Sequence, residues 1–289
     1  MTVAIVILTL NEEKSLPYAL DSVTGWADEV FVLDSFSTDR TLDVAKQYGC
    51  HVFQNRFEDY GKQRNHAISA LPIESEWIFF LDADEWMTDA LKQEIAQRTA
   101  LRPEENGFFV KRRLIWMGKW IRRGYYPIWI LRLFRRAKGR SEQRTVNEHV
   151  IVDGKVGYLK NDFVHEDRKG IHEWIVKHNW YATREALELL KQEEGERKEE
   201  IEVRFSGAQA ERKRWLRHRL WNRLPLVMRP FLYFLYRYVL RGGFLDGRPA
   251  LVYHFMQALW FPLLIDIKYF EIKHSIVLGQ IDPPNSKED

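Results

Sequence analysis

The segment WIFFLDADE (residues 77–85) places five consecutive apolar residues directly before a cluster of carboxylates. A short, unbroken apolar run bounded by polar residues predicts a strand that is buried on both faces. We expect this strand over residues 76–81, with Asp82 and Asp84 at its tip. An Asp-x-Asp pair is common in surface turns. At the end of a buried strand, however, it suits Mg²⁺ or Mn²⁺, which prefer oxygen ligands and bridge phosphates.

Strands and helices alternate around this segment over the first hundred residues. Apolar runs predict strands over 3–8, 29–33 and 51–54, and helical spacing predicts helices over 12–23, 40–48, 60–71 and 88–100. This alternation indicates βαβ units around a parallel sheet, hence an α/β fold whose ligands bind at the carboxyl edge of the strands. Four polar residues come just past strand ends: Thr9, Asp34, Asp82 and Asp84. We expect Ser37 or Thr38 to cap the helix over 40–48, and Asp39 to be a loop or cap residue.

The middle of the chain is strongly basic. Residues 111–144 contain twelve lysines and arginines and a single acid, Glu142. Such a stretch attracts anions, which include diphosphates, lipid head groups and nucleic acids. Shorter strands are expected over 108–113, 130–135 and 155–159, as a mixed or antiparallel extension, followed by a long helix over 172–199. Aromatic residues within 116–127 suit sugar stacking, although a solvated basic loop has the same composition.

The last third of the chain changes character after residue 204. A basic stretch over 212–223 precedes two apolar, aromatic stretches, 224–240 and 250–270. Charged residues and prolines interrupt both stretches, so we expect helices that lie in a membrane interface rather than cross it. An ordinary buried helical subdomain is the alternative. The expected organisation is a donor-binding half (1–100), an acceptor-side half (101–200) and a membrane-associating region (201–289).

Two further features bear on location. The apolar run over 3–10 is short and has no basic residues before it, so we expect a buried strand rather than a signal peptide. Cys50 is the single cysteine, which excludes an intramolecular disulfide and fits a reducing cytoplasm.

Four motifs carry a resemblance to a known family. They are residues 5–12 (IVILTLNE), 32–39 (VLDSFSTD), 61–65 (GKQRN) and 80–85 (FLDADE). Their order resembles that of family 2 glycosyltransferases of the GT-A fold. Four later features are similar to the lipopolysaccharide-core β-1,4-glucosyltransferase-like branch: residues 132–134 (RLF), residues 146–149 (VNEH), His165 and residues 243–247 (GFLDG). The likeness covers nearly the whole chain.

The resemblance implies a role for each matching position. Glu148 would be the general base of an inverting transfer, with the neighbouring His149 as its competitor. His165 would complete the metal shell, although a lone histidine is as often structural. The donor-site roles are these: Thr9 and Glu12 line the nucleoside pocket, Asp34 binds the base or ribose, Lys62 and Arg64 hold the base or diphosphate, Asp82 contacts ribose and metal, and Asp84 ligates the metal.

The sequence thus predicts a metal-dependent glycosyltransferase that uses Mn²⁺ or Mg²⁺ and a nucleoside-diphosphate sugar, with a UDP-hexose expected. Its acceptor would be a lipid-linked or lipid-anchored glycan of a bacterial surface polysaccharide or lipopolysaccharide. It would work on the anionic, cytoplasmic face of the inner membrane as a peripheral or monotopic protein. Three alternatives remain open: a metal-dependent nucleotidyltransferase, a catalytically inactive membrane-bound nucleotide-binding scaffold and a nucleic-acid-binding module. The donor-site motifs have no place in the last, so no nucleic-acid partner is expected.

Overall fold

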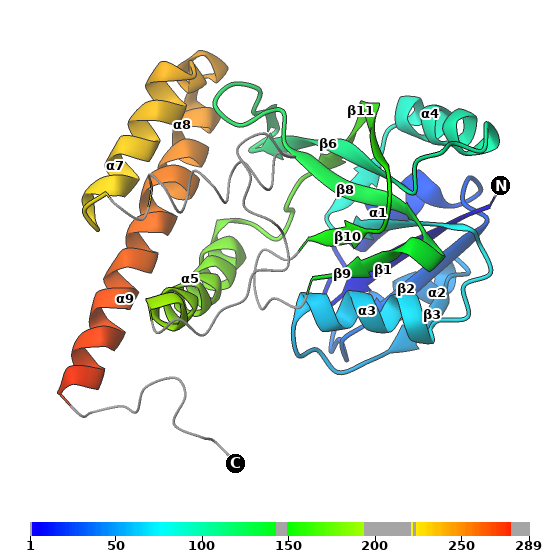
Figure 1. The fold of residues 1–289 in the computed structure, drawn as a ribbon, viewed down its shortest axis with the longest axis horizontal. Helices are drawn as coiled ribbons and strands as arrows, with labels where there is room; N and C mark the ends of the chain where they lie inside the picture. Colours follow the sequence, from blue (N-terminus) through cyan, green and yellow to red (C-terminus); the bar gives the residue numbers. More distant parts are fainter. Residues whose placement is uncertain (1, 143–148, 194–220, 222–223, 279–289) are drawn as a thin grey trace. The chain divides into compact units, whose positions relative to one another are not determined.

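The computed structural model describes residues 2–142, 149–193, 221 and 224–278 (Figure 1). The chain divides into two compact units. Unit 1 comprises Met1–Arg122 and Tyr126–Gly170, and unit 2 comprises Arg123–Tyr125 and Ile171–Asp289. The division falls after Gly170 and not near residue 200, because the long helix that we assigned to the acceptor-side half packs within unit 2.

Unit 1 is built on a sheet that has nine strands within the described residues. Its first half is parallel, as the alternation predicted, and consists in spatial order of β3 (His51–Gln54), β2 (Glu29–Asp34), β1 (Val3–Thr9) and β4 (Trp77–Asp82). The register pairs Thr9 with Asp34 and Leu8 with Asp82. The polar ends of β1, β2 and β4 therefore lie at one edge of the sheet, and their register differs by no more than one residue.

The second half of the sheet is the expected mixed extension. It contains β8 (Trp129–Arg135), β6 (Gly107–Trp116), β11 (Val156–His165), β5 (Glu85–Met87) and, beside β6, β7 (Lys119–Trp120). Strand β8 is antiparallel to β4 and β6, whereas β11 is parallel to β6. Strand β5 pairs with β11 so that His165 lies opposite Glu85. This pairing brings His165 next to the metal motif, from which it is about 80 residues away along the chain. A separate two-stranded sheet pairs β9 (Gly139–Ser141) with β10 (Val150–Val152).

Four helices cover this sheet: α1 (Leu16–Val23), α2 (Thr41–Gln47), α3 (Tyr60–Ala70) and α4 (Asp89–Ala100). Helix α1 begins four residues later than predicted, because Asn11 has a positive φ of 54° and the Glu12 N–H donates to the Thr41 hydroxyl. The predicted cap of α2 is wrong. The Ser37 hydroxyl binds Asp34, and the Thr38 N–H donates to Asn11. It is the Asp39 carboxylate that accepts from the Thr41 N–H, 2.9 Å away.

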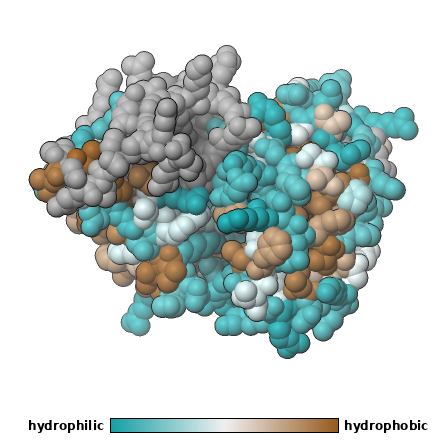
Figure 2. Space-filling view, turned by 90° about the horizontal axis from the view of Figure 1, so that it is seen from below, coloured by the Kyte–Doolittle hydropathy of each residue, from teal (hydrophilic) through white to brown (hydrophobic). Residues whose placement is uncertain are grey.

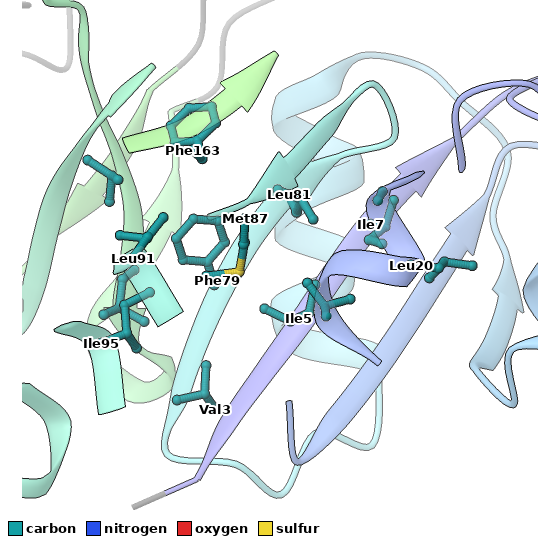
Figure 3. Close-up of a cluster of buried hydrophobic side chains, with 14 of the residues drawn as sticks. Val3, Ile5, Ile7, Leu20, Phe79, Leu81, Met87, Leu91, Ile95 and Phe163 are labelled. Carbon is teal, nitrogen blue, oxygen red and sulfur yellow. The ribbon is translucent and has the colours of Figure 1, made fainter. Parts of the chain in front are cut away.

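The alternation of side chains along the strands separates two hydrophobic layers. Ile5 and Ile7 of β1 face α1 and α4 together with Phe79 and Leu81 of β4 (Figure 3). Their neighbours along the strands, including Val6 and Phe80, pack on the other face with Ala67 of α3 and with Val150 and Val152 of β10. A sheet covered on both faces explains why its strands are continuously apolar and why polar residues begin only at their ends.

Unit 2 is helical. Its described elements are α5 (Ile171–Glu193), α7 (Met228–Phe234), the π-helical turn η3 (Leu235–Leu240), the 3₁₀ turn η4 (Gly243–Asp246), α8 (Arg248–His254), the π-helical turn η5 (Phe255–Trp260) and α9 (Phe261–Val277). Helix α5 packs on α9 through Ala186, Leu190 and Tyr269. The predicted basic stretch over 212–223 lies outside the described residues, apart from Trp221.

The predicted interruptions do not break the last helix. Elements α8, η5 and α9 form one helix, Arg248–Ile276, of 29 residues. By length and composition it is the one candidate membrane span among the described residues. Pro262 is the second residue of α9, just beyond the end of the π-helical turn η5 at Trp260, so its missing N–H falls close to the point where the hydrogen-bond pattern changes.

Candidate active site

The first polar group at the carboxyl edge is a buried carboxylate. Asp34, at the end of β2, accepts hydrogen bonds from the Thr9 hydroxyl at 2.9 Å, the Ser37 N–H at 2.8 Å and the Gln54 amide at 3.2 Å. Both Asp34 and Thr9 are buried. The structure thus brings together two predicted nucleoside-pocket residues, with Asp34 held by protein donors. Their contact with a nucleoside stays a prediction.

Asp82, at the end of β4, is held by two arginines. Its carboxylate forms ion pairs with the guanidinium groups of Arg132, at 2.8 Å, and Arg64, at 3.3 Å. Burial alone would raise the pKa of Asp82, but these two guanidinium groups outweigh it and hold the pKa well below its usual range. Arg64 thus lies beside the metal motif, and its role toward the base or diphosphate stays a prediction. The Arg132 contact, from β8, was not predicted.

Glu85 fixes the turn that carries the motif. Its side chain is fully buried, accepts the Asp82 N–H at 3.0 Å and pairs with Arg132 at 2.7 Å. Burial raises the pKa of Glu85 to about 7 despite the arginine, and the charge of Asp82 adds to this rise. Glu85 and Arg132 therefore hold Asp82 from two sides, one through its backbone and the other through its carboxylate.

Asp84 and His165 form a second pair. His165 Nδ1 lies 3.3 Å from Asp84 Oδ1 and 3.9 Å from Glu85. Burial alone would lower the pKa of His165, but the Asp84 carboxylate outweighs it and raises the pKa above its usual value. Nδ1 makes no well-formed hydrogen bond. A carboxylate oxygen that faces such a ring nitrogen is a donor set that Mn²⁺ accepts.

The three predicted metal ligands do not form a ready cluster. No group of three or more His, Cys, Asp or Glu side chains is arranged around a single point in the part of the chain that the structure describes. Asp84 and His165 face each other, whereas Asp82 is engaged by arginines. These residues fit a divalent ion only where other oxygen ligands, such as donor phosphates, complete the shell.

Two predicted donor-site residues have ionic partners elsewhere. The Glu12 carboxylate pairs with Lys169 at 2.6 Å, which ties the loop after β1 to the end of unit 1. Lys62 lies on the exposed side of α3 and pairs with Glu58. Their roles toward a nucleotide stay predictions.

Asn65 connects α3 to the β9–β10 hairpin. Its amide accepts the Ser141 N–H at 2.8 Å and donates to the Ser141 carbonyl at 2.9 Å. The predicted base Glu148 lies outside the described residues. Its competitor His149 is described, and its Nδ1 lies 3.8 Å from the buried Glu142 carboxylate. Since Arg64 contacts Asp82, two consecutive residues of α3 connect the end of β4 to Ser141 of β9.

The basic, aromatic segment of β6 and β7 is organised around Asp162. This buried carboxylate pairs with Arg113 at 3.3 Å and Lys111 at 3.4 Å and accepts the Tyr126 hydroxyl at 2.9 Å. The guanidinium groups of Arg113 and Arg122 lie 4.4 and 4.1 Å from the centre of the Trp120 ring. The Trp120 ring therefore contacts arginines, and sugar stacking on this segment remains a prediction.

Comparison with known proteins decides the family. Residues 4–163 match the model of the family described as Glycosyl transferase family 2, which is more than half of the chain. The chain is a family 2 glycosyltransferase. With its mixed sheet flanked by helices, this membership confirms the expected GT-A-like α/β fold.

This family 2 glycosyltransferase is 29% identical to the lipopolysaccharide core biosynthesis glycosyltransferase LpsC of Rhizobium meliloti, over 87% of this chain and 88% of the relative. It is also 29% identical to an uncharacterised glycosyltransferase of Rickettsia typhi, over 64% of this chain and 67% of the relative. The resemblance to lipopolysaccharide-core enzymes is thereby confirmed.

Solved structures are more distant. The TarS 1–349 structure from S. aureus in complex with UDP-GlcNAc is 16% identical with a TM-score of 0.44, covering 98% of this chain and 93% of that one. Glucosyl-3-phosphoglycerate synthase from Mycobacterium tuberculosis, solved with Mn²⁺ and UDP, is 24% identical with a TM-score of 0.32. The alignment covers 39% of this chain and 44% of the mycobacterial chain.

Sequence reasoning missed the ionic partners of the site. Glu85 stands next to the Asp-x-Asp pair and Arg132 opens the RLF motif, so both were visible without an assigned role. A buried glutamate directly after a metal motif is a usable signal, because a buried carboxylate requires a partner. Lys169 gave no local signal, since its partner Glu12 is 157 residues away.

Proposed function

We propose that this glycosyltransferase moves a sugar, with a UDP-hexose as the expected donor, to a lipid-linked or lipid-anchored glycan of bacterial surface polysaccharide or lipopolysaccharide. The observation that carries the donor part is the Asp82, Asp84 and His165 arrangement at the carboxyl edge of a family 2 domain. The relationship to LpsC supports a lipopolysaccharide-type acceptor.

The donor diphosphate would lie between fixed charges of this edge. Asp84 and His165 would hold Mn²⁺ or Mg²⁺ together with the diphosphate, and Asp82 would contact both metal and ribose. When bound, the ion supplies positive charge against the departing nucleoside diphosphate. Arg64 and Arg132 already hold Asp82 ionised and oriented at this edge.

The transfer would invert the sugar. The acceptor oxygen forms a bond to C1 while the bond from C1 to the diphosphate oxygen breaks, and Glu148 takes the hydroxyl proton. His149 is the competing base, and its neighbour Glu142 would orient the imidazole as carboxylates orient catalytic histidines. The expected products are a nucleoside diphosphate and the lengthened glycan. Release of pyrophosphate would instead indicate nucleotidyl transfer.

Calorimetry of UDP binding tests the donor site. UDP should bind in the presence of Mn²⁺ and lose affinity when a chelator is added. Asp84→Ala should abolish the metal-dependent part while leaving the circular dichroism spectrum unchanged. Asp89→Ala, at an exposed acid at the start of α4, is the matched control and should bind like the native chain. Equal UDP affinity with and without chelator would overturn the metal assignment.

The place of action would be the cytoplasmic face of the inner membrane, with the enzyme peripheral or monotopic. The apolar helix Arg248–Ile276 supports this location, since only 28% of its most apolar window is buried within the protein. A lipid-borne acceptor would then meet the donor site at the membrane surface.

A further inference from the structure

Four charged residues of the C-terminal hairpin, which we define as residues 228–276, are buried: Arg229, Arg237, Asp246 and Asp266. Arg229 and Asp266 are both buried and pair with each other, with Arg229 Nε 3.0 Å from the carboxylate. Buried Asp246 accepts the Arg123 N–H at 2.7 Å and pairs with its guanidinium at 3.2 Å. Arg229, which interrupts the apolar stretch over 224–240 in the sequence, is thus neutralised inside unit 2.

Arg237 is internal in the same way. It is 5% exposed, and its Nε donates to the Gly124 carbonyl at 2.8 Å. Its guanidinium lies 5.3 to 5.6 Å from the ring centres of three tyrosines, Tyr125, Tyr233 and Tyr253. Cation–π contacts of this kind stabilise a charge away from water.

The outer face of the hairpin is correspondingly apolar. One stripe on α7 and η3 recurs every three or four residues, as one face of a helix does: Met228, Phe231, Leu232, Leu235, Tyr236, Val239 and Leu240. The turn and the next helix add exposed Phe244, Leu245, Leu251 and Phe255. Between residues 228 and 266, which are all described, the exposed charged residues are Arg241 and Arg248. Hydrophobic side chains are visible among the C-terminal helices at the left of Figure 2.

We propose that this face inserts into the near leaflet of an anionic bilayer, with Leu240, Phe244 and Leu245 as the penetrating tip. Lipid tails offer no hydrogen-bond partners, so a lipid-facing surface keeps its charges inside the protein, as here. The two exposed charges are both positive: Arg241 lies between Leu240 and Phe244, and Arg248 lies three residues after Leu245. Long arginine side chains beside the tip can extend back to anionic head groups. A water-facing surface would show the opposite distribution of apolar and charged residues.

The first arm of the hairpin enters the membrane without crossing it. This arm consists of α7, Met228–Phe234, with 7 residues, and η3, Leu235–Leu240, with 6 residues. At about 1.5 Å per residue they reach about 20 Å, against a hydrocarbon core of about 30 Å. This deepens the membrane location of the proposed function and rests on it, but it does not depend on the donor site.

Vesicle flotation tests the insertion. The full chain should float with vesicles of phosphatidylglycerol and phosphatidylcholine and bind weakly to phosphatidylcholine alone. The double variant Leu240→Ser/Leu245→Ser should lower the partition coefficient at least about tenfold, because each buried methylene favours the membrane severalfold. Arg241→Gln and Arg248→Gln should each lower it about fivefold, and only on anionic vesicles.

The exposed end of α4 in unit 1 offers matched controls. Leu101 is 77% exposed, comparable with 74% for Leu240, and Arg98 is an exposed arginine three residues before it. Leu101→Ser and Arg98→Gln should float like the native chain. An environment-sensitive dye on Leu245→Cys, in a Cys50→Ser background, should shift to the blue on anionic vesicles, whereas the same dye on Leu101→Cys should not.

Three outcomes would overturn the proposal. The first is flotation that is unchanged in the tip variants, and the second is a dye at residue 245 that stays in water. The third is self-association: a native chain that dimerises without lipid, and tip variants that become monomeric yet float normally, would assign the face to a second copy. Asp84→Ala separates this test from the donor site, because it should lose UDP binding and still float.

Discussion

Replacing Arg132 should destabilise unit 1 by an amount that the burial of its partners sets. In Arg132→Met the carboxylates of Glu85 and Asp82 lose a guanidinium at 2.7 and 2.8 Å. Removing one partner of a buried ion pair costs about 3–5 kcal/mol. The Asp82 side chain is 38% exposed and can recruit water, whereas Glu85 is 0% exposed and cannot. We therefore expect a loss near the lower end, about 3 kcal/mol, caused mainly by Glu85.

Hydrogen exchange of the backbone amides of β4 and β8 measures the loss of stability in the two strands that carry Asp82 and Arg132. Arg132→Met/Glu85→Gln should recover about 1–3 kcal/mol, because a neutral amide replaces the buried carboxyl group that has lost its cation. The control is Arg135→Met on the same strand. Its partner Glu76 is 39% exposed, so the expected cost is about 1 kcal/mol. If Arg132→Met exchanges like Arg135→Met, the buried network does not hold the motif and our reasoning fails.

Three more predictions follow from single residues. Glu148→Gln should lower turnover by about 10²–10⁴-fold with UDP affinity unchanged; normal turnover there, with a loss in His149→Ala, would make His149 the base. Burial raises the pKa of Cys50 to about 11, so iodoacetamide should modify it about 100-fold more slowly at pH 8 than an ordinary thiol, as mass spectrometry can measure. Burial and the charge of Arg237 lower the pKa of His254 to about 4, so the folded state keeps this ring neutral while the unfolded chain protonates near 6.5. The free energy of unfolding should then fall by up to about 3 kcal/mol between pH 6.5 and 4, and His254→Gln should remove that dependence.

The parallel half of the sheet could be predicted because its signals are local. Strands β1, β2 and β4 are each a mainly apolar run that ends at a polar residue, and sheet register then brings Thr9, Asp34 and Asp82 to one edge. The start of α1 was misplaced for a non-local reason. The side chains that hold residues 12 and 13 out of the helix, Thr41 and Asp39, belong to the next βα unit.

The partners within the site are beyond local reasoning for the same cause. Arg132 is 47 residues from Glu85 and 50 from Asp82 along the chain. Only the antiparallel pairing of β8 with β4 brings them together. The number of basic residues does not identify the partner of Asp82 and Glu85 either, because residues 111–144 contain several arginines. In the structure the partner is Arg132, which is buried beside both carboxylates.

The C-terminal hairpin shows how a sequence pattern can mislead when only charge is counted. Arg229 and Arg237 look like interruptions in an apolar segment, and the same residues in the structure are internal. Each has a partner on another segment: Asp266 of α9 for Arg229 and the Gly124 carbonyl for Arg237. What matters for membrane contact is therefore not the number of charges in the segment but the number left without an internal partner on its outer face.

The same principle separates the two carboxylates of the metal motif. Asp82 has its charge balanced by protein cations, so it is held in place whether or not a metal is bound. Asp84 faces His165, whose ring nitrogen and the carboxylate oxygen can both turn to one ion. Under our proposal, Asp82 sets the position of the turn and Asp84 makes binding depend on the metal. Asp84→Ala should consequently remove metal-dependent UDP binding at little cost to stability, whereas any change that strands Asp82 or Glu85 should unfold β4 and β8 first. If both kinds of variant lost stability equally, this division of roles would be wrong.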